Sequence, residues 1–418
     1  MRKILLLVML ASFYSIVNGQ SKNRCASNEA IRQQMSIDPA YAKKVQEGLK
    51  NKGAYQSKNK KGSPASIMIP VAVHVLYNSA DQNISDAQVQ SQIDVLNEDF
   101  TASNRDYNNY DAGYGSVKGD MDIKYCLVQI IHKQTKLKSF AVTDNMKYDQ
   151  RGGSDAIDPM HVLNIWVCNL SGGVLGFAYY PGISPEKFGV VCHTNAFGKG
   201  SQYNLFPEYN LGRTVTHEIG HCFGLVHIWG DAHCGSDLVD DTPLHNDPNF
   251  GCPGEGHLST CTGTPLEMWM DYMDYTDDRC MYFFSDGQVS RADFFIDTDL
   301  QLNSIINSAC NTITSNTSNT NGANAITNSS RIIGSSNLFL YPTITPGELT
   351  LITNSAVKEN AELNIYNQTG SLVMKQRLLV AEGNSSKAIN VSKLGDGIYI
   401  LQLSTGAEKK TAKFVVHH

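Results

Sequence analysis

The chain has 418 residues, more than one hydrophobic core usually supports, so two or more folded units joined by connecting segments are expected. Apolar residues make up 41% and charged residues 18%, the proportions of an ordinary globular protein, which exclude a largely disordered chain. The formal net charge of -6 gives no indication of a nucleic-acid partner.

Residues 1–19 have the pattern of a secretory signal peptide. Arg2 and Lys3 precede the apolar run Ile4–Phe13, and small residues follow near Gly19. This run is shorter than the roughly 20 residues of a transmembrane helix, and the sequence predicts no transmembrane segment. A membrane anchor is the alternative. We predict an exported protein, whose 10 cysteines could then form disulfides.

The next segments indicate a pro-segment followed by an α/β unit. Residues 20–66 are polar and basic and contain the loose run QSKNKKGSPAS, as expected of a removable pro-segment with an accessible cleavage region. Val71–Tyr77 alternates like a half-buried strand, and Ser85–Phe100 has one apolar helical face. The strand-like runs IKYCLVQII, VLNIWVC and FGVVC follow, which gives mixed α/β order.

The second half of the chain contains one more helix and a separate β unit. We predict a helix over Asn210–Trp229, with Asn210 as its cap and Gly224 as its breaker. This helix completes an ordered unit over residues 67–310. Asn, Ser and Thr dominate residues 311–337, which predicts a linker. Residues 338–418 contain short strand patterns separated by turn residues and predict a small all-β sandwich.

The segment THEIGHCFGLVH carries the chemistry of a metal site. His217 and His221 are four residues apart, so both imidazoles project from one helix face and can bind one zinc ion. Glu218 lies beside that ion, where it can take a proton from the attacking water. Gly224 allows a sharp turn that returns His227 to the metal. Three imidazoles leave one zinc position open, as in catalytic sites.

The bare HExxH pattern also arises by chance in helices with satisfied histidines. The additional glycine and third histidine, in an exported chain, make that explanation poor. The extended motif resembles that of metzincin metallopeptidases, which also have a methionine turn downstream. Here MDYMDYTDD supplies it, with Met273 as an apolar floor under the imidazoles, although a simple core methionine would look the same.

Within the metzincins, the chain is most similar to the pappalysin family in its bacterial members. RCASNEAIRQQM, GFAYYP, SDLVDDTP, YMDYTDD and a cluster of four cysteines carry the resemblance, which covers about Arg24 to Cys310. It implies a two-subdomain catalytic domain, with a twisted sheet and the active-site helix above a more irregular lower part. It also implies that Tyr275 helps to bind the metal or the reacting carbonyl, where a phenol can stabilise negative charge.

SDLVDDTP concentrates hard oxygen ligands on one loop, which suits calcium better than zinc. The resemblance implies a structural calcium ion here, with Asp237 and Thr242 as ligands and Asp240 or the carbonyl of Val239 adding to them. An acidic, solvated turn is the alternative.

Spacing alone allows three pairings of the clustered cysteines, and a second zinc site is the competing interpretation. The resemblance implies disulfides between Cys234 and Cys261 and between Cys252 and Cys280. The states of five further cysteines stay open: Cys126, Cys168, Cys192, Cys222 and Cys310.

Cys25 lies in the expected pro-segment, and a thiolate is a good zinc ligand. The resemblance implies that it occupies the open metal position until the pro-segment is cut. Ala26 departs from the glycine that follows this cysteine in the family, and a disulfide involving Cys25 is the alternative.

The resembling enzymes that cleave before basic residues use an acidic side chain between the methionine turn and the next cysteine. Asp277, Asp278 and Arg279 are the candidates here. An aspartate in the pocket would favour Arg or Lys after the scissile bond, whereas Arg279 would repel them. The sequence does not assign the pocket to one of these three residues, but the number of acidic residues favours cleavage before Arg or Lys.

SGGVLGFAYYPG is expected to contain an edge strand onto which an extended peptide substrate adds through main-chain hydrogen bonds. The C-terminal strands resemble the sorting domain of the type IX secretion route, which implies that export machinery as a partner. A carbohydrate-binding or adhesive sandwich is the alternative.

We therefore predict a secreted zinc endopeptidase, either released or held at the cell surface, that acts on protein substrates. The rival hypothesis is a noncatalytic binding protein on a protease-like fold. Glu218 argues against that rival, because a structural metal site would not need this carboxylate.

Overall fold

The structure is a computed structural model that describes residues 23–50, 67–308, 310 and 338–416, the last range with gaps at 342–343, 346, 356–357, 381–382 and 406–407. It divides into two units, Met1–Thr317 and Ser318–His418. The predicted signal peptide and the linker at 311–337 lie outside the described residues. Among those residues, no helix combines the length and the apolar character needed to cross a membrane.

The first unit is built on a six-stranded sheet with the order β1-β5-β6-β4-β2-β3. Its strands are β1 (Asn23–Cys25), β2 (Ile67–Tyr77), β3 (Ile123–Gln134), β4 (Leu163–Cys168), β5 (Val174–Ala178) and β6 (Val190–His193). All adjacent pairs are parallel except β5 and β6, which are antiparallel. These strands confirm the predicted mixed α/β order.

The helices of this unit are α1 (Ser27–Ile37), α2 (Pro39–Gly48), α3 (Asp86–Phe100), α4 (Arg213–Cys222), α5 (Asp286–Thr298) and α6 (Leu300–Ile306). The predicted helix over residues 85–100 is confirmed as α3, which Ser85 caps by accepting from the backbone N–H of Gln88. Its apolar residues Val89, Ile93, Leu96 and Phe100 are buried in the main core.

The prediction of a helix over Asn210–Trp229 was wrong at both ends. Helix α4 begins at Arg213, and the residue before it, Gly212, has a φ of 80°, a left-handed conformation that glycine adopts easily. The helix ends at Cys222, and Gly224 turns the chain with a φ of 79°. A Cβ atom on Gly224 would lie 2.2 Å from the ring of Phe295, so packing against α5 also requires glycine here.

Between α4 and α5 the chain has little regular structure. Only a short 3-10 turn, Asp278–Cys280, and isolated β-bridges interrupt the loops of this described stretch. The sheet with α4 and the irregular part after Gly224 correspond to the two expected subdomains. Disulfides Cys234–Cys261 and Cys252–Cys280 crosslink the irregular part, and Cys126–Cys310 joins β3 to the end of the unit.

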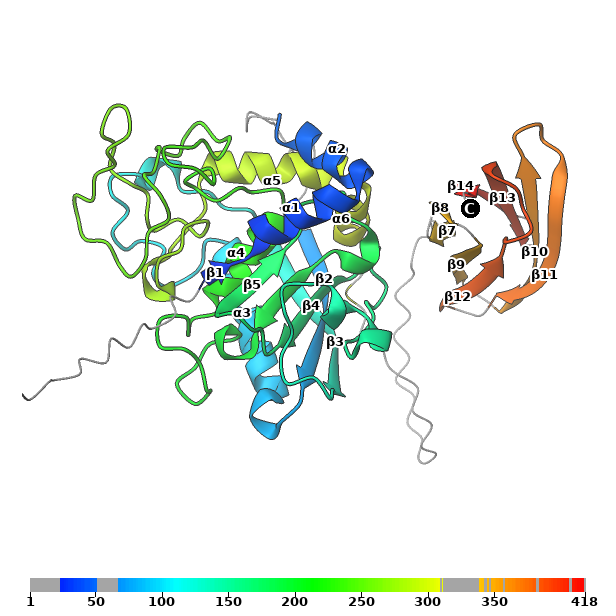
Figure 1. Cartoon of the computed structure of the whole chain (residues 1–418), viewed down its shortest axis with the longest axis horizontal. Coiled ribbons are helices and arrows are strands. Elements are labelled where there is room, and N and C mark those ends of the chain that lie inside the picture. Colours follow the sequence, from blue (N-terminus) through cyan, green and yellow to red (C-terminus); the bar gives the residue numbers. More distant parts are fainter. Residues whose placement is uncertain are drawn as a thin grey trace, which may run out of the picture. The chain divides into compact units, whose positions relative to one another are not determined.

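Residues 23–50 of the expected pro-segment are part of the folded unit. Strand β1 pairs in parallel with β5, and α1 continues across that side of the sheet (Figure 1). Helix α2 packs on α5, where a Cβ atom on Gly48 would lie 2.9 Å from Phe295. The predicted edge strand therefore has β1 as its outer neighbour here, and β5 would become the edge if β1 left.

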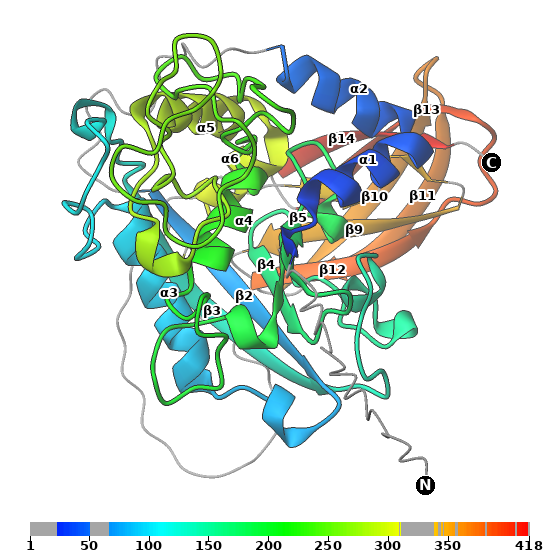
Figure 2. The ribbon, with the colours of Figure 1, turned by 60° about the vertical axis from the view of Figure 1, so that its left-hand side comes forward.

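The second unit is a sandwich of two sheets in which most neighbouring strands are antiparallel. One sheet has the order β11-β10-β13-β14-β8 and the other β12-β9-β7. The strands are β7 (Leu338–Tyr341), β8 (Ile344–Thr345), β9 (Glu348–Ser355), β10 (Glu359–Asn367), β11 (Leu372–Val380), β12 (Gly383–Asn390), β13 (Gly397–Thr405) and β14 (Glu408–Val416). Figure 1 labels all of them, and Figure 2 labels β9 to β14 from a second direction. Leu349 and Leu351 of one sheet share a buried core with Leu363 and Leu401 of the other. This confirms the predicted all-β sandwich.

Candidate active site

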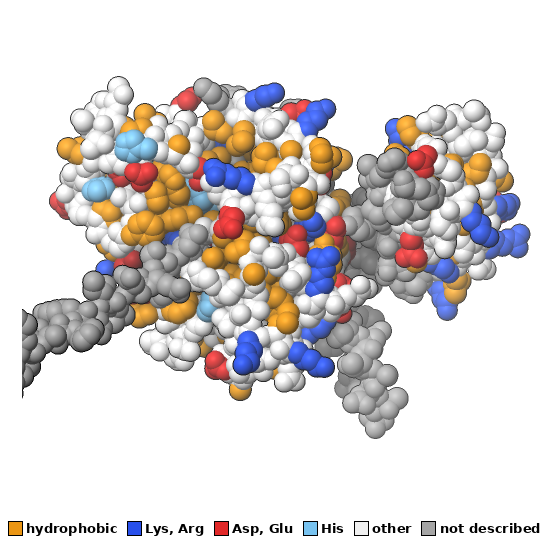
Figure 3. All heavy atoms as spheres, viewed as in Figure 1, with side chains coloured by type: hydrophobic (Ala, Val, Ile, Leu, Met, Phe, Trp, Pro, Cys, Tyr) orange, Lys and Arg blue, Asp and Glu red, His pale blue; other side chains and the backbone are white. Residues whose placement is uncertain are grey.

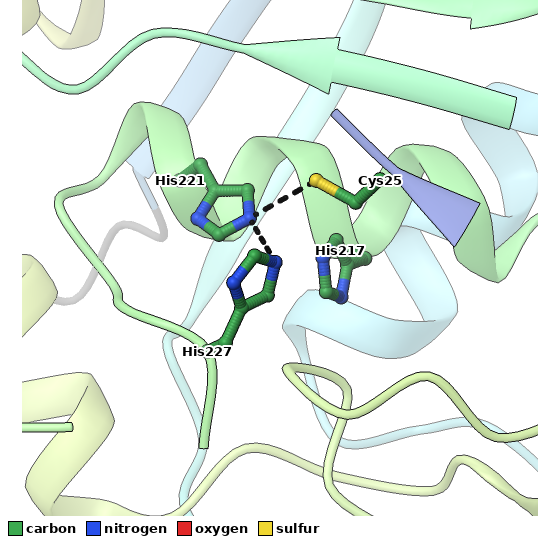
Figure 4. A group of neighbouring side chains, drawn as sticks. All are labelled: Cys25, His217, His221 and His227. Atoms are coloured by element: carbon green, nitrogen blue, oxygen red, sulfur yellow. Dashed lines mark hydrogen bonds between the residues drawn. The ribbon is translucent and has the colours of Figure 1, made fainter. Parts of the chain in front are cut away.

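Three histidines converge beneath β5, two from α4 and one from the loop after it (Figure 4). His217 and His221 occupy one face of α4, and Gly224 redirects the chain so that His227 faces them. His221 Nε2 and His227 Nε2 are 3.1 Å apart. The Sγ atom of Cys25 lies 3.5 Å from His221 Nε2, and one ligand atom from each of these four residues lies within 4.8 Å of the others.

Each imidazole is oriented through its other nitrogen. His217 Nδ1 lies 2.7 Å from the carbonyl oxygen of Tyr272, and His221 Nδ1 lies 2.8 Å from that of Leu225. His227 Nδ1 lies 2.6 Å from Asp231 Oδ1. These contacts favour the tautomer that leaves each Nε2 lone pair for a metal.

The donor set fits zinc. Burial lowers the pKa of His221 to about 3 and that of His217 well below its usual value, so both rings are neutral. Buried His217 Nε2 has no hydrogen-bond partner among the described residues, as expected of an atom that awaits a cation. Three imidazoles and a sulfur atom offer nitrogen and sulfur ligands, which zinc prefers.

Glu218 follows His217 on α4 and is completely buried beneath the pro-segment. Its Oε2 accepts a hydrogen bond from Ser27 Oγ at 2.8 Å and lies 3.4 Å from Cys25 Sγ. Burial raises the pKa of Glu218 to about 8, against the smaller opposing effects of these hydrogen bonds. The adjacent residue of β5 is Gly176, where a Cβ atom would come within 2.9 Å of Glu218 Oε1, so the carboxylate needs glycine there.

The methionine turn lies below the histidines. Met273 is fully buried, and its Sδ lies where a Cβ atom on Gly220 of α4 would meet it at 2.4 Å. The hydroxyl of Tyr275 lies 3.2 Å from His227 Nε2 and donates to the carbonyl oxygen of Cys25 at 3.0 Å. The phenol therefore stands at the edge of the imidazole cluster, and in this form it contacts the pro-segment.

The pro-segment contacts the site at two further residues. Arg24 donates from Nη2 to Asp278 Oδ1 at 3.0 Å and from Nη1 to the carbonyl oxygen of Thr276 at 2.6 Å. Ser27 Oγ accepts from the backbone N–H of Ala178 on β5 at 2.8 Å while it donates to Glu218. Ala26 between them has a φ of -110°, so this position does not require the glycine of the family pattern.

The three specificity candidates differ in their environments. Asp278 is buried and meets Arg24, and its Oδ2 also accepts from the backbone N–H groups of Leu211 and Arg213. Asp277 pairs with Arg279 at 3.3 Å, and the Arg279 side chain is 73% exposed. Only Asp278 among these three contacts a basic side chain of the pro-segment.

The predicted calcium ligands are only partly brought together. Asp237 is buried, and both of its carboxylate oxygens accept from Thr242 Oγ1, at 2.8 and 3.0 Å. Thr242 Oγ1 also lies 3.1 Å from the carbonyl oxygen of Val239. Asp240 is exposed and is not gathered with them.

The cysteines divide into two groups. Cys234–Cys261 and Cys252–Cys280 are the pairs that the resemblance implies, and the Cys126–Cys310 pair had been left open. Of the cysteines in the described ranges, four are buried without a disulfide partner: Cys25, Cys168, Cys192 and Cys222.

Sequence reasoning missed Arg24, Ser27 and Asp231. Arg24 and Ser27 flank the cysteine of the pro-segment, so a basic residue and a hydroxyl beside a metal-binding cysteine were the available signals. Asp231 lies four residues after His227, and an acidic residue close to a metal-binding histidine commonly orients it.

Known proteins match both units. Residues 146–297 match the family model described as pregnancy-associated plasma protein-A, and residues 340–417 match a secretion system C-terminal sorting domain. An extracellular metalloprotease of Arthroderma benhamiae is 30% identical over 267 residues, which cover 60% of this chain and 79% of that protein. An extracellular metalloprotease of Colletotrichum graminicola is 32% identical over 241 residues, which cover 54% of this chain and 75% of that protein.

Solved structures give the same result. A promirolysin variant from Tannerella forsythia is 35% identical, with a TM-score of 0.61, and the match covers 68% of this chain and 96% of that one. Mature mirolysin from the same organism, in complex with a cleaved peptide, is 39% identical, with a TM-score of 0.56 and coverage of 59% and 97%.

The fold and the site thus define a metzincin-type zinc metallopeptidase. The chain belongs to the pappalysin family and carries a type IX secretion sorting domain. It is a secreted metalloendopeptidase, and these findings do not favour the noncatalytic binding protein. The described form is organised as a zymogen, with the pro-segment seated on the active site.

Proposed function

We propose that His217, His221 and His227 hold the catalytic zinc and that Glu218 is the general base for peptide hydrolysis. The convergence of three imidazoles beside a buried carboxylate carries this assignment. Zinc bound there would supply a Lewis acid that polarises the peptide carbonyl and activates water. Glu218 takes the proton of that water and passes it to the leaving amine. Tyr275 donates its hydroxyl to the developing oxyanion.

The experiment that tests this assignment is metal removal and replacement in the processed enzyme. A chelator should abolish cleavage of a denatured protein substrate, and stoichiometric zinc should restore it. Activity that survives complete removal of zinc, verified by elemental analysis, would contradict the assignment. Circular dichroism of the metal-free enzyme separates loss of metal from loss of fold.

Latency comes from three side chains of the pro-segment, each of which blocks a different catalytic requirement. Cys25 occupies the open metal position, as its 3.5 Å approach to His221 Nε2 suggests. Ser27 bonds to the general base and to a backbone N–H of β5 that a substrate would use. Arg24 fills the pocket of Asp278. Removal of the pro-segment frees all three positions together.

Cleavage occurs before a basic residue. In the resembling enzymes an acidic side chain at this place pairs with the residue after the scissile bond, and here Arg24 supplies a guanidinium to Asp278. We infer that Arg24 stands in for a substrate Arg or Lys. Arg279 points to solvent instead, where it would not repel the substrate.

A calcium ion binds at Asp237 and Thr242, with the carbonyl of Val239 as a third ligand. The support is a buried carboxylate next to two further oxygen atoms, with a pKa raised to about 7 by burial. A hard cation would balance that carboxylate. The exposed position of Asp240 leaves it out of this ligand set.

The domain boundaries follow from the same proposals. Residues 20–66 are the removable pro-segment, 67–310 the catalytic domain and 338–418 the sorting domain, which engages the type IX machinery. Division of the chain into units near Thr317 supports separate folding of the last two.

A further inference from the structure

A hollow lined mostly by residues with polar or charged side chains lies between α1 of the pro-segment and the catalytic domain. Its volume is about 360 Å³. Residues of α1, including Gln34, form one wall, and Asp144, Arg151, Tyr179 and Lys187 contribute to the other. When the pro-segment leaves, the second wall stays with the enzyme and the hollow opens.

Gln34 fills part of this hollow with a hydrogen-bond acceptor. Gln34 is 6% exposed, and its Oε1 accepts a hydrogen bond from Lys187 Nζ at 3.1 Å. Lys187 Nζ also lies 3.4 Å from Asp144 Oδ2. Departure of the pro-segment removes the amide acceptor and leaves Lys187 with donor capacity, because an ammonium group offers three N–H bonds.

Asp144 alone does not balance the charge of Lys187, because two other groups also contact the Asp144 carboxylate. The fully buried Lys147 lies with Nζ 3.5 Å from Asp144 Oδ1, and the hydroxyl of Tyr179 donates to the same oxygen at 3.1 Å. Lys147 Nζ also donates to the carbonyl oxygen of Lys187. The catalytic wall of the hollow is lined by two cations, Arg151 and Lys187, and one carboxylate, so it favours an anionic or amide group.

The register of β1 on β5 locates this hollow relative to the scissile bond. Cys25 pairs with Gly176, and Arg24 fills the proposed pocket for the residue after the bond. That pocket lies toward Val174, so the residues before the bond extend along β5 toward Ala178 and Tyr179. If each substrate residue lies opposite one residue of β5, Tyr179 lies opposite the third or fourth substrate residue before the scissile bond.

We propose that Lys187 forms an unprimed subsite that selects Glu, Asp or Gln at the third or fourth residue before the scissile bond. Asp144 and Lys147 position Lys187, and Gln34 occupies this subsite in the zymogen. Together with the pocket of Asp278, the subsite defines substrates that carry an acidic or amide residue upstream and a basic residue downstream. This inference rests on the proposed peptidase function and its basic preference.

The test uses the processed, zinc-loaded enzyme and fluorogenic peptides with Arg fixed after the scissile bond. The third and fourth upstream positions carry Glu, Gln, Ala or Lys in turn. We expect kcat/KM for Glu to exceed that for Lys by about threefold to fivefold, the range of a partly exposed ion pair. K187Q should remove the preference and K187E should invert it. Lys136, an exposed lysine of another loop, provides the control variant K136E, which should keep the wild-type order.

Equal rates for all upstream residues would overturn the inference, and so would a preference that K187E leaves unchanged. The temperature of thermal unfolding of K187Q, compared with that of the parent, separates loss of the preference from misfolding. Failure of the wild-type enzyme to cleave any peptide of the set would overturn the proposed function itself. The two failures are therefore distinguishable.

Discussion

Arg24 and Asp278, 254 residues apart in sequence, form an ion pair with a distance of 3.0 Å from Nη2 to Oδ1 and no exposed side-chain surface. The ring of Tyr209 lies 5.0 Å from the guanidinium carbon. Removing one partner of such a buried pair typically costs about 3–5 kcal/mol. Arg24→Ala should therefore loosen the pro-segment and accelerate activation. Time courses of precursor cleavage, with the exposed Arg32→Ala as control, measure this effect.

Asp278→Asn should remove the preference for a basic residue after the scissile bond. Loss of the charged partner is expected to lower kcat/KM for Arg by about 100-fold, or about 3 kcal/mol, and to leave Ala or Leu almost unchanged. Asn retains an oxygen for the backbone N–H groups of Leu211 and Arg213. Asp277→Asn is the matched control. Sequencing of cleavage products gives the answer, and enrichment of Arg or Lys that persists in Asp278→Asn would refute this pocket.

Ser27→Ala tests the contact with the general base. Hydrogen bonds to charged groups contribute about 1.5–3 kcal/mol, so autoprocessing should accelerate by about tenfold or more. Cys25→Ala should accelerate it as well, because the open metal position would then admit water. Since the two side chains block different groups, the double variant should process faster than either single one. A precursor with both substitutions that stays as latent as the parent would exclude both roles.

Calcium should stabilise the enzyme in a pH-dependent manner through Asp237. Its pKa in the folded state is about 7, above the unfolded value of 3.8, so its ionised form destabilises the fold as pH rises between these values. Calcium binds that ionised form, and its stabilising effect should therefore be larger at pH 8 than at pH 5. Thermal unfolding with calcium or chelator measures this difference, and Asp237→Asn should abolish it. Equal calcium effects in the variant and the parent would exclude the site.

Deletion of residues 339–418 should prevent export but leave catalysis intact, because the sorting domain folds as a separate unit. Fractionation of producing cells should find the shortened enzyme in the periplasm, with kcat/KM equal to that of the full chain. Secretion of the shortened enzyme at the normal level would contradict the sorting assignment.

Features that depend on residues close together in sequence were predictable, whereas features that depend on contacts between distant segments were not. His217 and His221 were predictable because helix geometry is local and fixes a four-residue spacing to one face. The ends of α4 were not, since the glycines on either side of it respond to packing with distant residues such as Phe295. The register of β1 on β5 and the contact of Ser27 with Glu218 join segments about 150 to 190 residues apart, for which one sequence carries no spacing rule.

The sequence predicts the net charge of the chain but not how charged side chains are distributed over its surface. In the view of Figure 3, acidic and basic side chains are interspersed over the catalytic unit. The net charge of -6 therefore does not reveal the locally cationic wall around Lys187, which depends on residues from two separate loops.

Glu218→Ala provides the most direct test of the central claim, since Glu218 is a base and not a metal ligand. The processed variant should bind one zinc ion per molecule by elemental analysis and should unfold at the temperature of the parent. Its hydrolysis of an Arg-containing peptide should fall by at least about 100-fold, the usual contribution of general base catalysis. Near-parental turnover with stoichiometric zinc would contradict the mechanism.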